Sequence, residues 1–155
     1  MNLIVAIDRK GAIGRRGELL YHISADLRRF KALTTGHTVV MGRKTFESLP
    51  KGALPNRRNI VVSRQTDFSA PGIEVAHSLE SALGMADSSD IYIIGGAEIY
   101  RQALPMADRL LLTVIDAETP DADTFFPAMP LDDFTIDCIE ACEGYKFIDL
   151  TRKQA

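Results

Sequence analysis

Apolar residues along the chain form short runs that alternate with stretches of helical spacing. The runs LIVAI (3–7) and IYII (91–94) are apolar throughout and rich in β-branched residues, whereas apolar residues within 25–33 recur every three or four positions. This alternation predicts strands interleaved with helices. The predicted strands are Leu3–Ile7, Thr38–Met41, Asn59–Val62, Ile73–Val75, Ile91–Ile94, Arg109–Ile115, Phe134–Glu140 and Tyr145–Leu150, and the predicted helices are Ala25–Leu33, Lys44–Leu49, Ser78–Met85 and Glu98–Leu104.

The continuously apolar strands indicate a sheet that is buried on both faces. Helices on each side of a mostly parallel sheet produce such burial, since parallel strands need long crossover connections. The last two predicted strands are separated by Glu143-Gly144, which is typical of an antiparallel hairpin. We therefore predict an α/β fold whose sheet ends in an antiparallel pair.

One acidic residue stands on the apolar side of a predicted helix. The helix is expected to start at Ser24, a favourable N-cap residue. At about 100° per residue, Asp26 falls inside the apolar stripe and Arg29 at its edge. A first-turn carboxylate can simply complement the helix dipole, but on an apolar face it can also be the polar group of a binding pocket. The stripe consists of Ile23, Leu27, Phe30 and Leu33.

Composition narrows the classes of partner. The 155 residues fit a single domain (1–155), and 18 basic against 21 acidic residues, a net charge of −3, give no signal for binding nucleic acid or an anionic membrane. No apolar run approaches the roughly 20 residues of a membrane-spanning helix, and the N-terminal run is too short for a signal peptide. Cys138 and Cys142 have no partners at metal-ligand spacing. We expect a cytoplasmic monomer without a metal site.

Two predicted loops are long for a compact domain. Residues 8–23 contain three glycines without clear periodicity, and residues 116–127 are acidic and rich in turn-forming residues. Loops of this length are commonly lids or binding loops, although plain connections are also common. The first loop is therefore a candidate lid.

Three predicted strands end in residues suited to phosphate. MGRKT (41–45) and IGGAE (94–98) place glycine at a strand-to-helix turn, and VSR (62–64) ends in a hydroxyl and a guanidinium. None is specific alone, but ligands of open α/β sheets bind at the carboxyl ends of strands, so together they favour an extended ligand with several phosphates. The G-x-G-x-x-G and P-loop patterns are absent from the sequence, which disfavours an ordinary Rossmann or P-loop site.

In order and spacing, these motifs resemble those of dihydrofolate reductases of the bacterial chromosomal type. The resemblance covers nearly the whole chain. It implies a mostly parallel eight-stranded sheet with an antiparallel C-terminal strand, flanked by about four helices, and reduction of 7,8-dihydrofolate to 5,6,7,8-tetrahydrofolate with NADPH. The motifs are AIG (12–14), ADLRRFK (25–31), MGRKTFESL (41–49), LPNRRNIVVSR (54–64), IIGGAEIY (93–100) and LTVIDAETPDADTFFP (112–127).

The resemblance also implies roles around the pterin ring of dihydrofolate. Asp26 would pair with the pterin's amino and ring-nitrogen donors and promote protonation of the imine nitrogen, and Thr113 would support it. Arg57 would bind the α-carboxylate of the glutamate tail. Tyr21 stands where the family has tryptophan and would hold water near Asp26. The pocket for dihydrofolate, and for antifolate-type inhibitors, would be lined by Ile4, Val5, Ala6, Leu27, Phe30, Leu49, Leu54 and Ile94.

For NADPH, the resemblance implies a second set of contacts. Arg43, Lys44 and Thr45 would bind cofactor phosphates, while Ser63 and Arg64 would bind the adenosine 2′-phosphate that distinguishes NADPH from NADH. The other implied cofactor contacts are Ala6, Ile13, Gly14, Gly42, Gly95, Gly96, Ala97, Glu98, Ile99 and Tyr100.

Two other functions stay open at this point. A ribosylaminopyrimidine reductase of riboflavin synthesis has the same fold, but it would lack Asp26 and Arg57 and is usually fused to a deaminase. A nucleotide-binding module without catalysis would explain the phosphate-binding ends but leaves Asp26 without a purpose. An assay for NADPH oxidation that depends on dihydrofolate would distinguish these two alternatives from dihydrofolate reduction.

Overall fold

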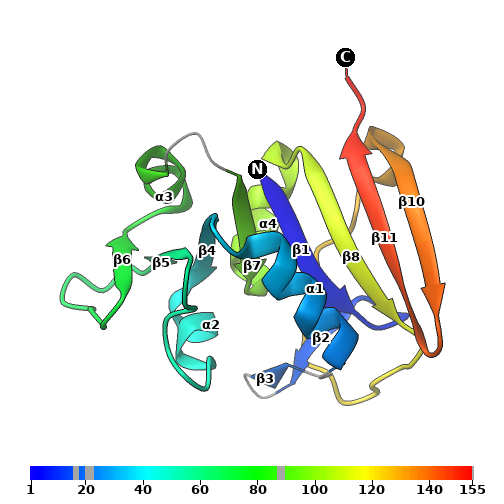
Figure 1. Cartoon of the computed structure of the whole chain (residues 1–155), viewed down its shortest axis with the longest axis horizontal. Helices are drawn as coiled ribbons and strands as arrows, with labels where there is room; N and C mark the ends of the chain where they lie inside the picture. The colour runs from blue at the N-terminus through cyan, green and yellow to red at the C-terminus, as the bar shows by residue number, and fades with distance from the viewer. Residues whose placement is uncertain (16–17, 20–22, 87–89, 155) are drawn as a thin grey trace.

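The computed structural model describes residues 1–15, 18–19, 23–86 and 90–154, and its main element is a large twisted sheet (Figure 1). Within the described residues this sheet has eight strands in the order β10-β11-β8-β1-β7-β4-β5-β6. The strands are β1 (Asn2–Ile7), β4 (Thr38–Gly42), β5 (Arg58–Val62), β6 (Ile73–Ala76), β7 (Ile91–Gly95), β8 (Arg109–Ile115), β10 (Phe134–Cys142) and β11 (Tyr145–Arg152).

Strand directions follow the predicted pattern. β1 lies between its parallel neighbours β7 and β8, and β4, β5 and β6 continue the parallel pairing on one side. β11 runs antiparallel to both β8 and β10. The expectation of a mostly parallel sheet with an antiparallel C-terminal strand is confirmed.

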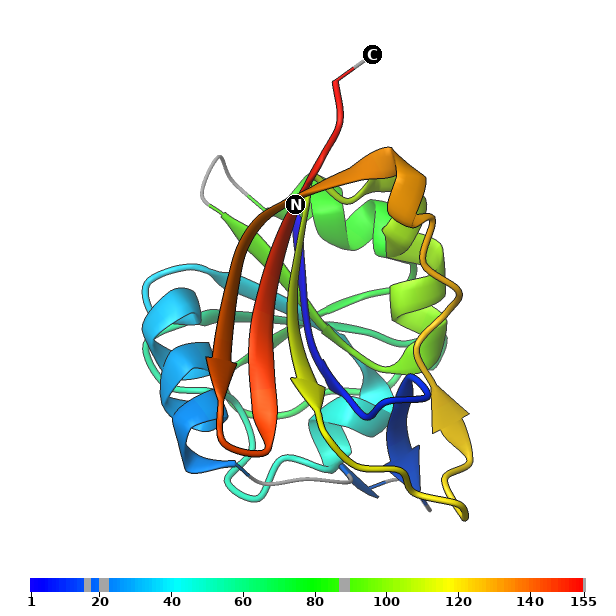
Figure 2. The ribbon, with the colours of Figure 1, turned by 90° about the vertical axis from the view of Figure 1, so that its right-hand side faces the viewer.

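Helices cover both faces of the sheet, as Figure 2 shows, and the core is accordingly divided in two. Along β4, Val39 and Met41 pack on the face covered by α1 and α2, and Val40 packs on the face covered by α3 and α4, because side chains alternate along a strand. None of the described helices is long and apolar enough to cross a membrane. The helices are α1 (Ser24–Thr34), α2 (Arg43–Glu47), α3 (Leu79–Met85) and α4 (Ala97–Ala103), with 3-10 turns η1 (Leu104–Met106) and η2 (Leu131–Asp133).

The start of α1 differs from the prediction. Ser24 is the first helical residue, and the N-cap is Ile23, whose backbone is extended and whose side chain makes no capping bond. The Ser24 N-cap was therefore wrong, because the Ile23 carbonyl already accepts the first helical hydrogen bond from Leu27 at 3.0 Å. Leu27, expected on the apolar stripe, is 50% exposed.

The two long loops contain short strands that the sequence analysis did not predict. In the described residues, β2 (Ala12–Arg15), β3 (Glu18–Leu19) and β9 (Thr124–Phe125) form a second, three-stranded sheet in the order β3-β2-β9. The first loop therefore pairs with the loop 116–127 rather than standing alone. These strands of two to four residues show at most two steps of alternation, and the pattern gave no clear signal for them.

Candidate active site

Asp26 and Thr113 meet between α1 and β8. The Thr113 hydroxyl donates to Asp26 Oδ1 at 2.5 Å, although the residues are 87 positions apart in the sequence. Thr113 is buried, and Ala6 is its register partner on β1, so the carboxylate lies beside the central strands of the sheet. Asp26 itself is half-buried, which leaves its carboxylate accessible to a ligand.

Half-buried apolar side chains lie on the same face as Asp26. They pack on the core cluster beneath α1 and α2 but keep part of their surface exposed. An apolar wall next to one carboxylate suits a flat ring with a polar edge. The predicted pocket residues in this group are Ile4, Leu49, Leu54 and Ile94.

Two other predicted pocket residues differ from this group in their exposure. The Val5 side chain is buried in the core cluster on the opposite face, since it alternates with Ile4 and Ala6 along β1. The Leu27 side chain, one residue after Asp26 on α1, is half exposed. Tyr21, which was predicted to hold water near Asp26, lies outside the described residues.

Arg57 is held beside the C-terminal half of α1. Its Nε donates to the Pro55 carbonyl at 2.9 Å and one terminal nitrogen donates to Thr34 Oγ1 at 3.1 Å. The guanidinium carbon lies 5.9 Å from the centre of the Phe30 ring. Burial lowers the pKa of Arg57 from its ordinary value, but an arginine remains charged at neutral pH. The side chain therefore presents a fixed positive charge at one end of the apolar wall.

The glycines that end β7 lie against the start of α2. A Cβ added to Gly95 would lie 3.4 Å from Thr45 Oγ1 and 3.5 Å from the Tyr100 hydroxyl, and one added to Gly96 would lie 3.3 Å from Thr45 Oγ1. Gly95 has φ of +130°, which favours glycine, and the Gly95–Gly96 peptide is cis. On β4, a Cβ on Gly42 would lie 3.9 Å from the Gly96 nitrogen. Two of the three strand ends predicted to share one edge of the sheet, those of β4 and β7, are therefore adjacent.

Basic and hydroxyl groups surround this edge. Arg43 donates to Glu47 at 2.6 Å, while Lys44 is exposed. After β5, the buried Ser63 hydroxyl accepts from the Gln65 amide at 3.1 Å, and its own proton can be donated to a ligand. The exposed Arg64 follows.

The first turn of α4 contributes to the same edge. Glu98 is exposed, and hydrogen bonds from Arg101 and Gln102 lower its pKa, with a smaller contribution from the charge of Arg64. The positive charge of Arg64 therefore acts on the first turn of α4. Ala97 is half-buried and Ile99 is buried in the core.

Tyr100 connects the two halves of the site. Its buried hydroxyl donates to the Ile4 carbonyl on β1 at 2.8 Å. Burial raises the pKa of the phenol far above its ordinary value, and the charge of Asp26 raises it further. Tyr100 therefore stays neutral and lies within electrostatic range of Asp26.

Sequence reasoning missed the role of Asp8 at the base of the first loop. This buried carboxylate accepts, among the described residues, the backbone N–H groups of Lys10 at 2.8 Å, Ala12 at 2.9 Å and Thr119 at 3.0 Å. It precedes the predicted cofactor residues Ile13, buried in the core, and Gly14, also buried. An acidic residue directly after an apolar strand and before a glycine was the available signal.

No metal centre forms among the residues that the structure describes, since no group of three His, Cys, Asp or Glu side chains could hold an ion. The site is instead an apolar wall with one carboxylate, adjoining a glycine-rich edge with basic groups. This arrangement suits two ring systems brought face to face, one of them on a phosphate-bearing ligand.

Comparisons with known proteins agree with this chemistry. A family model described as dihydrofolate reductase matches residues 1–146. The type 3 dihydrofolate reductase of Salmonella typhimurium is 50% identical over 128 residues, which cover 82% of this chain and 78% of that protein. The dihydrofolate reductase of Haemophilus influenzae is 42% identical over 160 residues and 98% of each chain. A solved dihydrofolate reductase from Enterococcus faecalis, complexed with NADP(H) and RAB-propyl, superposes with a TM-score of 0.87 at 33% identity, covering 99% of this chain and 96% of that one.

Proposed function

The chain belongs to the dihydrofolate reductase family and catalyses the NADPH-dependent reduction of dihydrofolate, and from this premise we propose which side chains carry out each part of the reaction. The whole chain, residues 1–155, acts as one catalytic domain. The observation that carries the assignment is the Asp26 carboxylate, bound by Thr113 and bordered by half-buried apolar side chains.

Asp26 binds the polar edge of the pterin and directs a proton to it. A carboxylate accepts hydrogen bonds from an amino group and a ring nitrogen side by side, as the pterin edge presents them. Its negative charge favours protonation of the neighbouring imine nitrogen, through water where no direct contact exists. Thr113 holds one carboxylate oxygen at 2.5 Å, so the carboxylate keeps a single orientation. NADPH, when bound, supplies the hydride.

The apolar wall orients the substrate ring and keeps water from it. Half-buried side chains lose further apolar surface when a flat ring covers them, which favours binding. Excluding water also strengthens the electrostatic effect of Asp26. The wall is formed by Ile4, Ala6, Phe30, Leu49, Leu54 and Ile94.

Arg57 binds the α-carboxylate of the glutamate tail. A guanidinium carries five N–H donors, so its bonds to Pro55 and Thr34 leave donors for a carboxylate. These same bonds fix the side chain before the substrate arrives, which reduces the entropy lost on binding.

The residues at the glycine-rich edge fit NADPH. A Cβ at Gly95 or Gly96 would crowd Thr45, and without one the protein backbone at these glycines can come close to a pyrophosphate. Lys44 and Arg43 supply positive charge for the phosphates, and Ser63 with Arg64 supplies a hydroxyl and a guanidinium for the 2′-phosphate.

The enzyme works as a cytoplasmic monomer. In this proposal one chain supplies every side chain that acts in the reaction, so no partner subunit is needed. Antifolate-type inhibitors with N–H donors like those of the pterin bind at Asp26 and compete with dihydrofolate.

Replacing Asp26 tests the assignment. We expect Asp26→Asn to lower turnover at pH 7 by about 100-fold, because general acid–base groups typically contribute about 10²- to 10⁴-fold. The NADPH affinity, measured by fluorescence titration, stays within about twofold. The control Asp108→Asn removes a carboxylate that pairs with the N-terminal amine at 2.5 Å and keeps wild-type turnover. Wild-type turnover of Asp26→Asn at pH 7 would refute the role.

A further inference from the structure

Arg29 links α1 to the strand beyond the one that carries Thr113. One terminal nitrogen donates to Asp149 Oδ1 at 2.5 Å, and the guanidinium carbon lies 4.5 Å from the centre of the Phe147 ring. The Arg29 and Asp149 side chains are 21% and 24% exposed, so the ion pair is largely shielded from water. A pair with this geometry and burial holds its partners more firmly than an exposed ion pair does.

Strand register places these contacts beside the catalytic carboxylate. Phe147 on β11 is the register partner of Thr113 on β8, and Asp149 is the partner of Leu111. Register partners point to the same face of a sheet, so both anchors of Arg29 lie on the Thr113 face. Asp26 and Arg29 are three positions apart and therefore on the same side of α1.

In the described part of the chain, few other polar side-chain contacts fix the N-terminal half of α1, where Ala25 is half-buried, as is Phe30 just beyond it. All residues of α1 are described, and of these Thr34, in the last turn, is the one that is fully buried. The N-cap residue Ile23 makes no side-chain hydrogen bond. Leu27 and Arg28 are exposed. Among the described residues, the polar contacts that tie the first two turns to the sheet are those of Asp26 with Thr113 and of Arg29 with Asp149 and Phe147.

We propose that Arg29 and Asp149 form a positioning pair, which sets the angle of α1 so that the Asp26 carboxylate meets Thr113 and the substrate in one orientation. Arg29 does not touch the reacting atoms. It acts through Asp26, and a misplacement of about 1 Å at a reacting group can lower the rate by about 100-fold. The proposal rests on the role of Asp26 given above.

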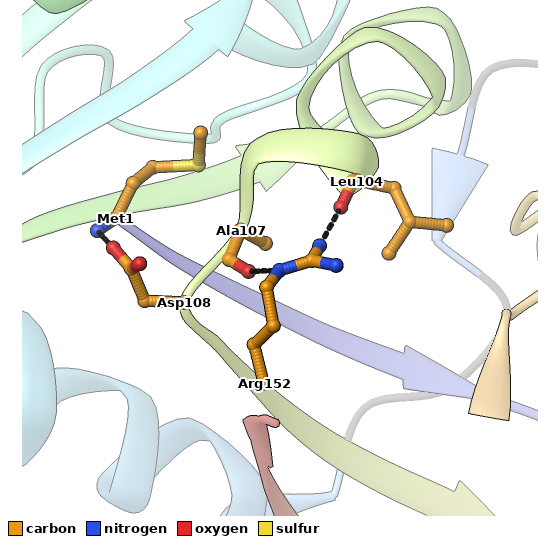
Figure 3. A network of polar contacts seen from close by, with 5 residues as sticks. All are labelled: Met1, Leu104, Ala107, Asp108 and Arg152. Carbon is orange, nitrogen blue, oxygen red and sulfur yellow. Dashed lines mark hydrogen bonds and ion pairs between the residues drawn. The ribbon is translucent and has the colours of Figure 1, made fainter. Parts of the chain in front are cut away.

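The other end of β11 offers a matched control. Arg152 also stacks on a phenylalanine, with its guanidinium carbon 4.6 Å from the centre of the Phe134 ring. As Figure 3 shows, it donates to the Ala107 carbonyl at 2.7 Å and to the Leu104 carbonyl at 2.8 Å. It lies five residues beyond Phe147 along the strand, or about 16 Å. Arg152→Met therefore removes a similar stack, together with two hydrogen bonds to backbone carbonyls, far from Asp26.

The test compares Arg29→Met, Arg29→Lys, Asp149→Asn, the Arg29→Met/Asp149→Asn double variant and Arg152→Met. Dihydrofolate-dependent oxidation of NADPH gives kcat and KM, and thermal unfolding gives Tm. We expect Arg29→Met and Asp149→Asn each to lower kcat on the order of tenfold while KM rises less than kcat falls. The double variant is no worse than the poorer single variant, because both remove one interaction.

The remaining variants separate positioning from general stability. Arg29→Lys keeps the charge and has a kcat between those of Arg29→Met and the wild type. Arg152→Met lowers Tm by about as much as Arg29→Met does, but it keeps kcat within about twofold of the wild type. Wild-type kcat in Arg29→Met or Asp149→Asn, or an equal loss in Arg152→Met, overturns the proposal. If Arg29→Met does not fold, Asp149→Asn and Arg29→Lys decide by the same criteria. Failure of Asp26→Asn to lower turnover would instead refute the role of Asp26.

Discussion

At the scale of single residues, Tyr100 shows how the core restricts the charge of a side chain near the site. Its hydroxyl is buried and bound to the Ile4 carbonyl, and burial raises its pKa far above 10.0. The phenol therefore stays neutral in the folded protein at pH values where it ionises in the unfolded chain. Its contribution to stability is complete below about pH 10 and is lost as the pH rises above that value.

The Tyr100→Phe variant measures both the stabilisation by the hydrogen bond to the Ile4 carbonyl and the loss of stability at high pH. At pH 7 we expect the variant to lose about 1 kcal/mol of unfolding free energy, the contribution of one hydrogen bond. Above about pH 10 the wild type loses roughly 1.4 kcal/mol per pH unit through this group, and the variant does not. Urea unfolding at pH 7, 9 and 10.5 should therefore show the difference shrinking at the highest pH. A difference that stays constant over this range contradicts the buried neutral phenol.

Single residues were predictable where the local pattern contained the signal. Asp26 stands on the apolar side of a short amphipathic helix, and that position alone raised the question of a ligand. The Arg29–Asp149 pair has no such signal, because its partners are 120 positions apart and arginine at the edge of a helical stripe is usually solvated. Contacts of this kind depend on strand order and register, which pattern alone does not determine.

At the scale of elements, Asp8 joins the first loop to the loop 116–127. Its carboxylate accepts from Lys10 and Ala12 on one side and from Thr119 on the other, and β2 continues the link by pairing with β9. We call these contacts of Asp8 the Asp8 clamp. Because β2 contains Ile13 and Gly14, the clamp fixes two residues that are predicted to contact the cofactor.

Asp8→Asn should loosen this clamp. An asparagine has one acceptor oxygen, and its NH₂ group would face backbone donors, so we expect a loss of about 1–3 kcal/mol of unfolding free energy. Hydrogen exchange at the Ala12 and Thr119 amides should accelerate more than exchange in β8. The control Asp116→Asn weakens a 3.5 Å pair between exposed Arg9 and Asp116 in the same loops and should leave both amides protected. Equal protection in Asp8→Asn and wild type would contradict the clamp.

The longer elements were predicted from periodicity, and the shortest ones were not. All the strands of the main sheet and helices α1 to α4 were anticipated within a few residues, because all of them except the four-residue β6 are runs of five or more residues, which show their period. β2, β3 and β9 exist through pairing between loops distant in sequence. The start of α1 was misplaced by one residue because a good capping residue followed the position where the backbone entered the helix.

At the scale of the whole molecule, the parallel strands bring distant motifs to one edge. β7, β4 and β5 are adjacent and parallel, so Gly95, Gly42 and the Ser63-Arg64 segment end on the same side. This was predictable because the rule for carboxyl ends needs only strand direction and adjacency. A ligand that bridges these ends binds the folded chain alone and therefore stabilises the whole fold.

Thermal unfolding with cofactor tests this bridging and the selectivity together. At about 100 times its Kd, NADPH should add about 2.7 kcal/mol, or roughly 5–10 °C in Tm for a chain of this size. NADH at the same concentration should add less, because it lacks the 2′-phosphate. Arg64→Gln should reduce the shift with NADPH and leave the shift with NADH unchanged, since in the proposed site the guanidinium binds no part of the cofactor other than that phosphate.

Lys153→Gln provides the control for the change in net charge. Lys153 follows β11, which runs antiparallel to β8, so it lies beyond the amino ends of the parallel strands and far from Arg64. The Lys153→Gln variant should keep the wild-type difference between the Tm shift with NADPH and the Tm shift with NADH. Both variants lose one positive charge. If the difference in Tm shift between NADPH and NADH is smaller in Arg64→Gln alone, the selectivity for NADPH arises at the end of β5. Equal narrowing in both would mean that net charge, rather than a contact at this strand end, distinguishes the two cofactors.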